Sequence, residues 1–127
     1  MSLQAVASTK EGEVSAGTLR EAIEIRRVRG QRYTVREAVA IVVPLATHDA
    51  ALHADGTTFY LHASALNHGP AGTEVDPLKA SVLPTHDRDR AMLAPETRKG
   101  QPGDARASVF SIGALFYELV TGESVGP

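Results

Sequence analysis

Histidines are the first residues of this chain that suggest chemistry, but their spacing does not favour a metal site. The five are His48, His53, His62, His68 and His86. Two ligands on one helix face need i, i+4 spacing, and His48 and His53 are five positions apart, so their side chains diverge. Asp49 and His53 do have this spacing, which many surface pairs share. We therefore expect neither a metal nor a cofactor.

A charged run and a serine are the next candidates for catalysis. The run His86-Asp87-Arg88-Asp89-Arg90 contains acids and bases, but so dense a run of charge predicts an exposed loop. Ser111 lies in Phe-Ser-Ile-Gly rather than in the Gly-x-Ser-x-Gly turn of hydrolases, which argues against a nucleophile. We expect Glu96 and Glu118 to be structural partners of arginine or backbone groups.

A basic cluster lies at the end of the first predicted helix. Its members are Arg26, Arg27, Arg29 and Arg32. Positive side chains at a helix C-terminus compensate the helix dipole, and we favour this interpretation over a phosphate site.

Composition narrows the function classes further. The length of 127 residues predicts a single domain. The net charge of −2 argues against a nucleic-acid or anionic membrane-surface partner, because neither would be attracted to it. It has no cysteine, which excludes disulfides and a cysteine nucleophile. No apolar run approaches the roughly 20 residues of a membrane span, and no secretory signal is visible. We expect a cytoplasmic protein, and the abrupt end at Gly126-Pro127 leaves open a piece of a longer chain.

Two helices are predicted by capping boxes, in which a threonine and a glutamate three positions later bond each other's backbone N–H. Thr18 and Glu21 start a helix that should end at Gly30. Thr34 and Glu37 start a second that should run to about His53, with a kink at Pro44 inside it. The side chains expected to face the core are Leu19, Ala22, Ile23 and Val28 in the first helix, and Val35, Ala38, Val39, Val42, Leu45, Ala46 and Leu52 in the second.

The middle of the chain predicts a β-hairpin. Residues 57–62 are β-prone, with Phe59 and Leu61 on one face, and residues 78–83 would form the return strand. Between them, residues 67–72 are rich in turn formers. A short strand is also possible at residues 3–7.

Residues 108–120 predict a buried helix around which the domain is built. Their apolar stripe comprises Val109, Ile112, Gly113, Phe116 and Val120, widened by Phe110, Leu115 and Leu119. Thr121-Gly122 is a plausible stop. The fold class is therefore α+β and mainly α-helical, with a β-hairpin.

Four segments in order resemble the large lobe (C-lobe) of the eukaryotic-type Ser/Thr protein kinases found in bacteria. Ala94-Pro95-Glu96 is similar to the motif that closes the activation segment, and residues 110–122 to the lobe's central helix. Residues 17–19 resemble the helix after the hinge, and residues 52–56 the end of the helix before the catalytic loop. The structural motif positions are Ala94, Pro95, Glu96, Ser108, Ser111 and Gly113.

The resemblance divides the single domain, residues 1–127, into five parts. These are a hinge-like strand and loop (1–17), two helices (18–56), a hairpin region (57–84), an activation-segment-like loop (85–107) and the central helix (108–122).

The residues that the family uses for catalysis are replaced in this chain. Phe59-Tyr60-Leu61 stands where the resemblance implies His-Arg-Asp, and leucine cannot accept a proton. Leu66 stands in place of a magnesium-binding Asn and offers no oxygen. Asp-Phe-Gly is not found, Ser108 replaces the family's Asp, and no Gly-rich phosphate loop occurs.

The resemblance therefore implies a catalytically inactive, pseudokinase-like module that acts in regulation through a protein partner or as a homodimer. Apolar faces that a complete kinase covers would be open, and the hairpin edge (57–83) and the helix at 17–32 are candidate surfaces. One alternative is a piece of a kinase that binds ATP when complete. A second alternative is an unrelated α+β regulatory domain whose resemblance to a kinase is chance. The structure separates the two, because in a kinase-like lobe the helix at 108–120 should be nearly fully buried and Glu96 should lie just before that helix.

Overall fold

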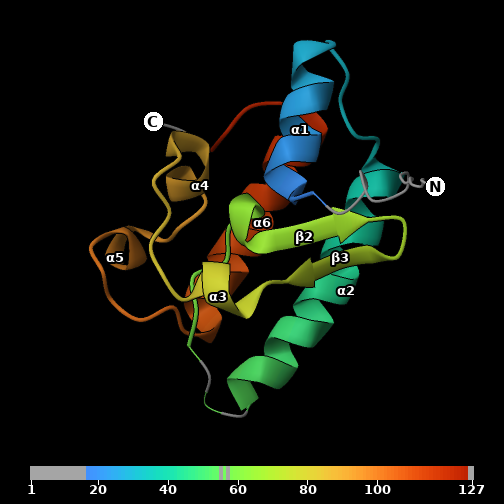
Figure 1. Ribbon diagram of the computed structural model, residues 1–127. Helices are drawn as coiled ribbons and strands as arrows, with labels where there is room; N and C mark the ends of the chain where they lie inside the picture. Colours follow the sequence, from blue (N-terminus) through green and yellow to red (C-terminus); the bar gives the residue numbers. More distant parts are fainter. Residues whose placement is uncertain (1–16, 55, 57, 126–127) are drawn as a thin grey trace, which may run out of the picture.

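The computed structural model describes residues 17–54, 56 and 58–125, and within them the side chain of Leu52 is left undescribed. The fold is mainly helical α+β, as predicted, with one two-stranded antiparallel sheet in the described residues. Three longer helices form the framework (Figure 1): α1 (Leu19–Val28), α2 (Val35–Ala54) and α6 (Ala105–Thr121). The strand predicted at residues 3–7 lies outside the described residues. No helix in the described ranges is long and apolar enough to cross a membrane.

Both predicted capping boxes are present. The Thr18 hydroxyl accepts from the Glu21 N–H at 3.2 Å, and the Glu21 carboxylate accepts from the Thr18 N–H at 2.9 Å. The same pair of bonds joins Thr34 and Glu37, at 3.0 and 2.9 Å. These bonds satisfy N–H groups that the first turn of a helix leaves free, so each helix begins where the sequence predicts. Helix α2 continues through Pro44 to Ala54.

Several apolar side chains of α1 and α2 do not reach the core, contrary to prediction. Leu19, Ile23, Ala38, Val42 and Leu45 are buried as expected. Val28, Val35, Val39 and Ala46 are exposed, Val28 by 81%. Each helix carries more apolar residues than one packed face can cover, and Ile41 and Asp49 occupy the rest of the buried face of α2.

The hairpin lies inside the predicted region, but its strands are not those predicted. Strand β2 (Leu66–Gly69) pairs with β3 (Gly72–Val75), and the turn between them falls in the predicted turn segment. Residues 58–62 form no strand, and residues 77–80 form a short helix, α3 (Pro77–Ala80), capped by Asp76. Burial of Phe59 and Leu61 against the helices replaces strand pairing there, so β-propensity is overridden by packing.

The region predicted as an activation-segment-like loop contains two short helices. They are α4 (Asp87–Ala91) and α5 (Pro95–Arg98), drawn in orange-brown at the left of Figure 1. A single turn of 3-10 helix, η2 (Ala63–Ala65), precedes β2.

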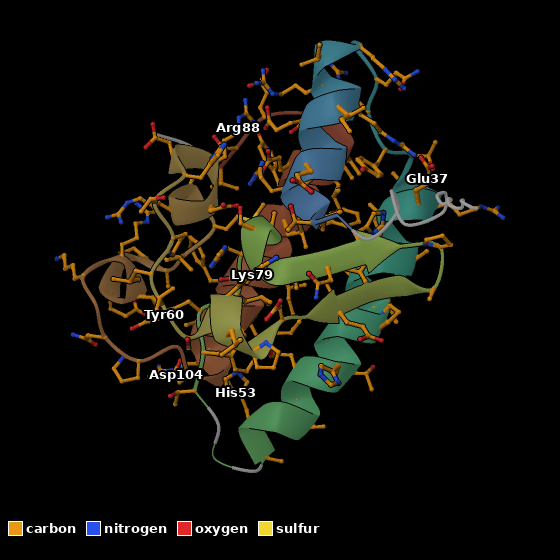
Figure 2. All side chains as sticks on the ribbon, viewed as in Figure 1. Glu37, His53, Tyr60, Lys79, Arg88 and Asp104 are labelled. Atoms are coloured by element: carbon orange, nitrogen blue, oxygen red, sulfur yellow. The ribbon has the colours of Figure 1, made fainter. Side chains whose placement is uncertain are left out.

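Helix α6 packs antiparallel against α2. The Tyr33 N–H, just before α2, donates to the Leu119 carbonyl at 3.1 Å, and His53 near the end of α2 bonds Ser108 in the first turns of α6. Asp104 caps α6 at its start, and Gly122, with φ of 78°, ends it as predicted. Figure 2 shows His53 and Asp104 at the same end of the molecule.

The prediction that α6 is buried on nearly every face is wrong. Its buried side chains are Ala107, Ser108, Ser111, Ala114, Leu115, Glu118 and Leu119. Val109 is 71% exposed, Phe110, Gly113 and Tyr117 are exposed, and Ile112, Phe116 and Val120 are only partly buried. The described chain covers one face of α6, and that face contains small and polar residues because it must fit closely against α2 and hold ion pairs.

Candidate functional site

The positions that the resemblance assigns to catalysis lie in or beside the hydrophobic core. Phe59, Leu61 and Leu66 are 6%, 3% and 0% exposed, and Tyr60 is half-buried. The Phe59 ring stacks on His53 with centroids 4.8 Å apart. These side chains contribute to packing, as apolar groups with this burial do.

A pocket of about 200 Å³ adjoins this segment. It is lined by Thr58, Phe59, Tyr60, Ala80, Ser81, Pro102 and Gly103. None of these lining residues is a carboxylate, a histidine or a lysine. The pocket therefore offers neither a general base nor a hard-cation ligand set from the described residues.

The predicted structural motif is not brought together into one site. Ala94 is buried at the start of α5, whereas Pro95 and Glu96 are exposed. The Glu96 side chain makes no hydrogen bond or ion pair within the described ranges, so the expected side-chain partner is not found; its carbonyl accepts from Lys99 and Gln101. Ser108 and Ser111 are buried and Gly113 is exposed on α6.

Asp49, His53 and Ser108 form a small polar cluster between α2 and α6. His53 Nε2 lies 3.0 Å from the Ser108 hydroxyl and 3.3 Å from Asp49 Oδ1. Burial raises the pKa of Asp49, and the Ser108 hydrogen bond and the His53 charge oppose this. Because both partners meet the same ring nitrogen, the imidazole cannot relay a proton from serine to aspartate as a hydrolase triad requires. No group of three or more metal-ligating side chains occurs among the described residues.

The charged run at 86–90 is not an exposed loop, and this prediction is wrong. Residues 87–91 form helix α4, and Asp89 is fully buried. Asp89 Oδ1 accepts from Arg20 Nε at 3.0 Å, and Arg20 also donates two hydrogen bonds to the Glu118 carboxylate at 2.7 and 3.1 Å. The expectation that Glu118 pairs with arginine is confirmed.

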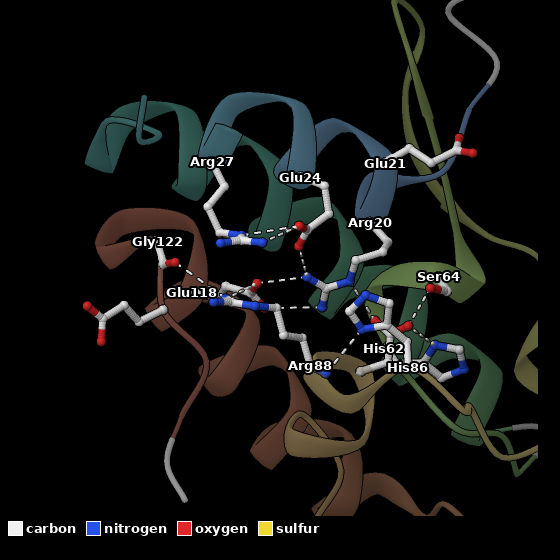
Figure 3. A network of polar contacts seen from close by, with 12 residues as sticks. Arg20, Glu21, Glu24, Arg27, His62, Ser64, His86, Arg88, Glu118 and Gly122 are labelled. Atoms are coloured by element: carbon white, nitrogen blue, oxygen red, sulfur yellow. Dashed lines mark hydrogen bonds and ion pairs between the residues drawn. The ribbon is translucent and has the colours of Figure 1, made fainter. Parts of the chain in front are cut away.

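Further contacts complete this buried charge network (Figure 3). Arg88 donates to Glu118 at 2.9 Å and to the Gly122 carbonyl at 3.4 Å. The Ser64 hydroxyl donates to the second oxygen of Asp89, and His62 Nδ1 lies 3.9 Å from the same oxygen. The buried charge network thus joins α1, α4, α6 and the segment around η2 through groups from distant parts of the sequence.

Protonation in the buried charge network follows from burial and from the opposite charges. Burial tends to lower the pKa of Arg20, but hydrogen bonds and the charges of Glu118 and Asp89 raise it overall. Burial lowers the pKa of His62, Asp89 opposes this and Arg20 adds to it. The Glu118 carboxylate is held by Arg20 and Arg88, and the Asp89 carboxylate by Arg20 and Ser64, so both acids serve as structural partners. The His62 ring is buried beside them without a hydrogen bond in the described residues.

Sequence reasoning missed Arg20 and Asp89 because their pairing spans 69 positions. One local signal was available. Arg20 lies between Leu19 and Ile23, the two residues that bury the inner face of α1, so its side chain is directed toward the core. An arginine at such a position needs a buried acidic partner.

The basic cluster is partly neutralised. Arg26 pairs with Glu37 through two hydrogen bonds of 3.1 and 2.9 Å, and Arg27 pairs with Glu24 at 2.8 Å. The side chains of Arg29 and Arg32 are exposed and have no ion pair within the described part of the chain. The cluster therefore does more than compensate a helix dipole, because half of it is fixed by acidic partners.

Comparison with known proteins assigns no family. No protein-family model matches the chain, and no curated protein matches it significantly.

Proposed function

We propose that this chain is a catalytically inactive module that acts through contact with another protein or with a second copy of itself. The sequence resemblance suggests a kinase-like scaffold, but α6 lacks the nearly full burial expected of a kinase-like lobe, so the proposal includes the alternative of an unrelated regulatory domain. The observation that carries the proposal is the burial of Leu61 and Leu66. The sequence resemblance puts a catalytic aspartate and a magnesium-binding asparagine at these positions. Two core leucines there supply neither a proton acceptor nor an oxygen ligand. A cytoplasmic location is part of the proposal, on the composition arguments above.

Exposed apolar side chains on two surfaces support the interaction role. On α6, Val109, Phe110 and Tyr117 are 71%, 37% and 46% exposed. On α1, within the predicted surface at 17–32, Ile25 and Val28 are 53% and 81% exposed. Apolar groups gathered on one face favour a contact with a partner. The predicted hairpin edge is less open, because the His68 N–H of β2 already donates to the Gly17 carbonyl at 2.8 Å.

Calorimetric titration with ATP, with and without Mg²⁺, tests the inactive assignment. We expect no saturable Mg²⁺-dependent heat, while an active protein kinase titrated in the same buffer gives it. Saturable Mg²⁺-dependent binding by this chain would show that a nucleotide site exists, and the proposal would then be wrong.

Light scattering over a range of protein concentrations tests the homodimer. We expect a mass above that of the monomer that falls on dilution, and a Val109→Asp variant that shifts it toward the monomer. Val43, an exposed valine on α2 outside the two surfaces, gives a matched control, Val43→Asp, that should not. A stable monomer at every concentration would exclude the homodimer and leave only a different protein as partner.

A further inference from the structure

An open pocket of about 650 Å³ lies between the C-terminal end of α1, the segment at 31–33 and β2. The side chains that give it its chemistry are Ile25, Arg26, Arg29, Arg32, Tyr33 and His68. Pockets of this size accommodate several side chains of a ligand. Three arginines on its wall contrast with the chain's overall charge of −2.

One wall of this basic pocket is rigid. The Arg26 guanidinium lies 3.8 Å over the Tyr33 ring and is held by two hydrogen bonds to Glu37. An arginine fixed by a stacked ring and a carboxylate loses little further freedom when a ligand binds. Both carboxylate oxygens of Glu37 accept from Arg26, so Glu37 forms no ion pair with Arg29 or Arg32.

The remaining positive charge is available to a ligand. Arg29 and Arg32 are exposed on either side of Gly30, whose φ of 69° forms the turn between them. Neither has an acidic partner in the described ranges. The Arg32 side chain passes close to Gly122 at the end of α6. A methyl group added to Gly122 would lie 3.8 Å from both Cγ and Nε of Arg32. Arg29 and Arg32 thus line the pocket with side chains that make no hydrogen bond or ion pair in the described ranges.

His68 lines another side of the pocket. Its Nδ1 bonds the Thr73 hydroxyl at 2.7 Å, which holds the ring in place. Burial and the nearby Arg26 charge lower the pKa of His68, so its imidazole is neutral near neutral pH and adds no charge to the pocket.

We propose that this pocket binds an acidic peptide segment of a partner protein, with an apolar side chain of that segment against Ile25. The proposal rests on the protein-interaction function proposed above and names the chemistry of the partner. Arginine and tyrosine beside an exposed aliphatic group are typical of protein interfaces. A single phosphate would leave most of the pocket empty, whereas several carboxylates spread over the pocket would contact both Arg29 and Arg32.

Fluorescence anisotropy with a labelled short peptide, in which Glu and Asp flank a central Leu, tests the proposal on the full chain. The test variant is Arg29→Glu/Arg32→Glu. Both side chains are exposed, so folding should survive, and circular dichroism checks this. The matched control is Arg106→Glu/Arg36→Glu, which makes the same charge change at exposed positions outside the pocket.

We expect saturable binding that weakens as salt is added, and a loss of about tenfold or more in the test variant because two charge contacts become repulsive. The control variant should bind within about twofold of the natural chain. Equal binding by the two variants, or no binding at millimolar protein, would overturn the proposal. Displacement of the peptide by inorganic phosphate at equal concentration would also overturn it, in favour of a simple anion site.

The peptide experiment and the nucleotide titration test different proposals, so a negative result in one does not decide the other. Absence of peptide binding leaves the inactive assignment intact. Mg²⁺-dependent ATP binding would overturn the inactive assignment without affecting the peptide result, provided that the charge-reversed variant still binds ATP.

Discussion

Arg20 in the first helix and Glu118 in the last form a two-pronged ion pair, although 98 positions separate them. The Arg20 side chain is 5% exposed and the Glu118 side chain is fully buried. Asp89 joins the same guanidinium from α4. Arg20 and Arg88 together balance the two buried carboxylates, and Arg20 is the residue that joins all three helices.

We predict that Arg20→Ala lowers the free energy of unfolding by about 3–5 kcal/mol, because it leaves the buried Asp89 without an arginine and the buried Glu118 with Arg88 alone. Urea unfolding measured by circular dichroism gives the change. Arg27→Ala is the control, since Arg27 also pairs with an acid on α1 but lies at the surface, and it should change stability little. Similar losses for the two variants would show that burial of the pair does not matter.

A second prediction concerns pH and His62. Burial lowers the pKa of His62 in the folded chain below its ordinary value of 6.5. Below pH 6.5 the unfolded chain therefore binds a proton that the folded chain does not, and stability falls as the pH falls. We expect the melting temperature of the natural chain to drop more steeply between pH 7 and 5 than that of His62→Gln.

The exposed His48 supplies the control for this experiment, and His48→Gln should retain the natural slope. Parallel curves for the natural chain and His62→Gln would mean that His62 titrates alike in the folded and unfolded chains.

A third prediction places acid sensitivity at Glu37. The hydrogen bond from Arg26, a backbone bond from Thr34 and the Arg26 charge lower the Glu37 pKa to about 2. The contribution is present above the ordinary value of 4.5 and is lost as the pH falls toward 2. Glu37→Gln should lose less stability over this interval in a pH series of thermal melts. The difference should shrink in high salt, because the pair is partly exposed.

A fourth prediction compares two glycines. A methyl group on Gly103 would lie 1.7 Å from the Phe59 carbonyl oxygen, whereas one on Gly113 meets nothing within 4 Å. Gly103→Ala should destabilise by about 3 kcal/mol or more, since backbone must move. Gly113→Ala, in the interior of α6, should stabilise by about 0.5–1 kcal/mol. Equal effects of the two substitutions in urea unfolding would contradict the close approach of residues 59 and 103.

Local rules account for the parts of the fold that the sequence predicted. The Thr18 and Thr34 capping boxes and the stop at Gly122 each depend on residues within one helical turn. Such signals do not need knowledge of the rest of the chain. Helical spacing also predicts the burial of Leu19, Ala38 and Leu45, although it wrongly includes Val28 and Val35.

The errors have a common physical cause, which is that they concern contacts between distant segments. Residues 57–62 are β-prone, yet the described part of this segment, residues 58–62, forms no strand, and Phe59 packs on His53 instead. The buried face of α6 was assigned to its most apolar side chains, but Glu118 lies there because Arg20 requires it. A charged run looks exposed until the arginine that buries Asp89 is known.

The buried pairing of Arg20 also sets an order of events during synthesis. The ribosome makes Arg20 early, and its two acidic partners follow 69 and 98 positions later. Helix α1 can form by itself, since its capping box is local, but its final docking must wait until α6 has emerged. Through most of elongation Glu24 is therefore the acidic partner of Arg20 that is already present, and closure of the domain is a late step.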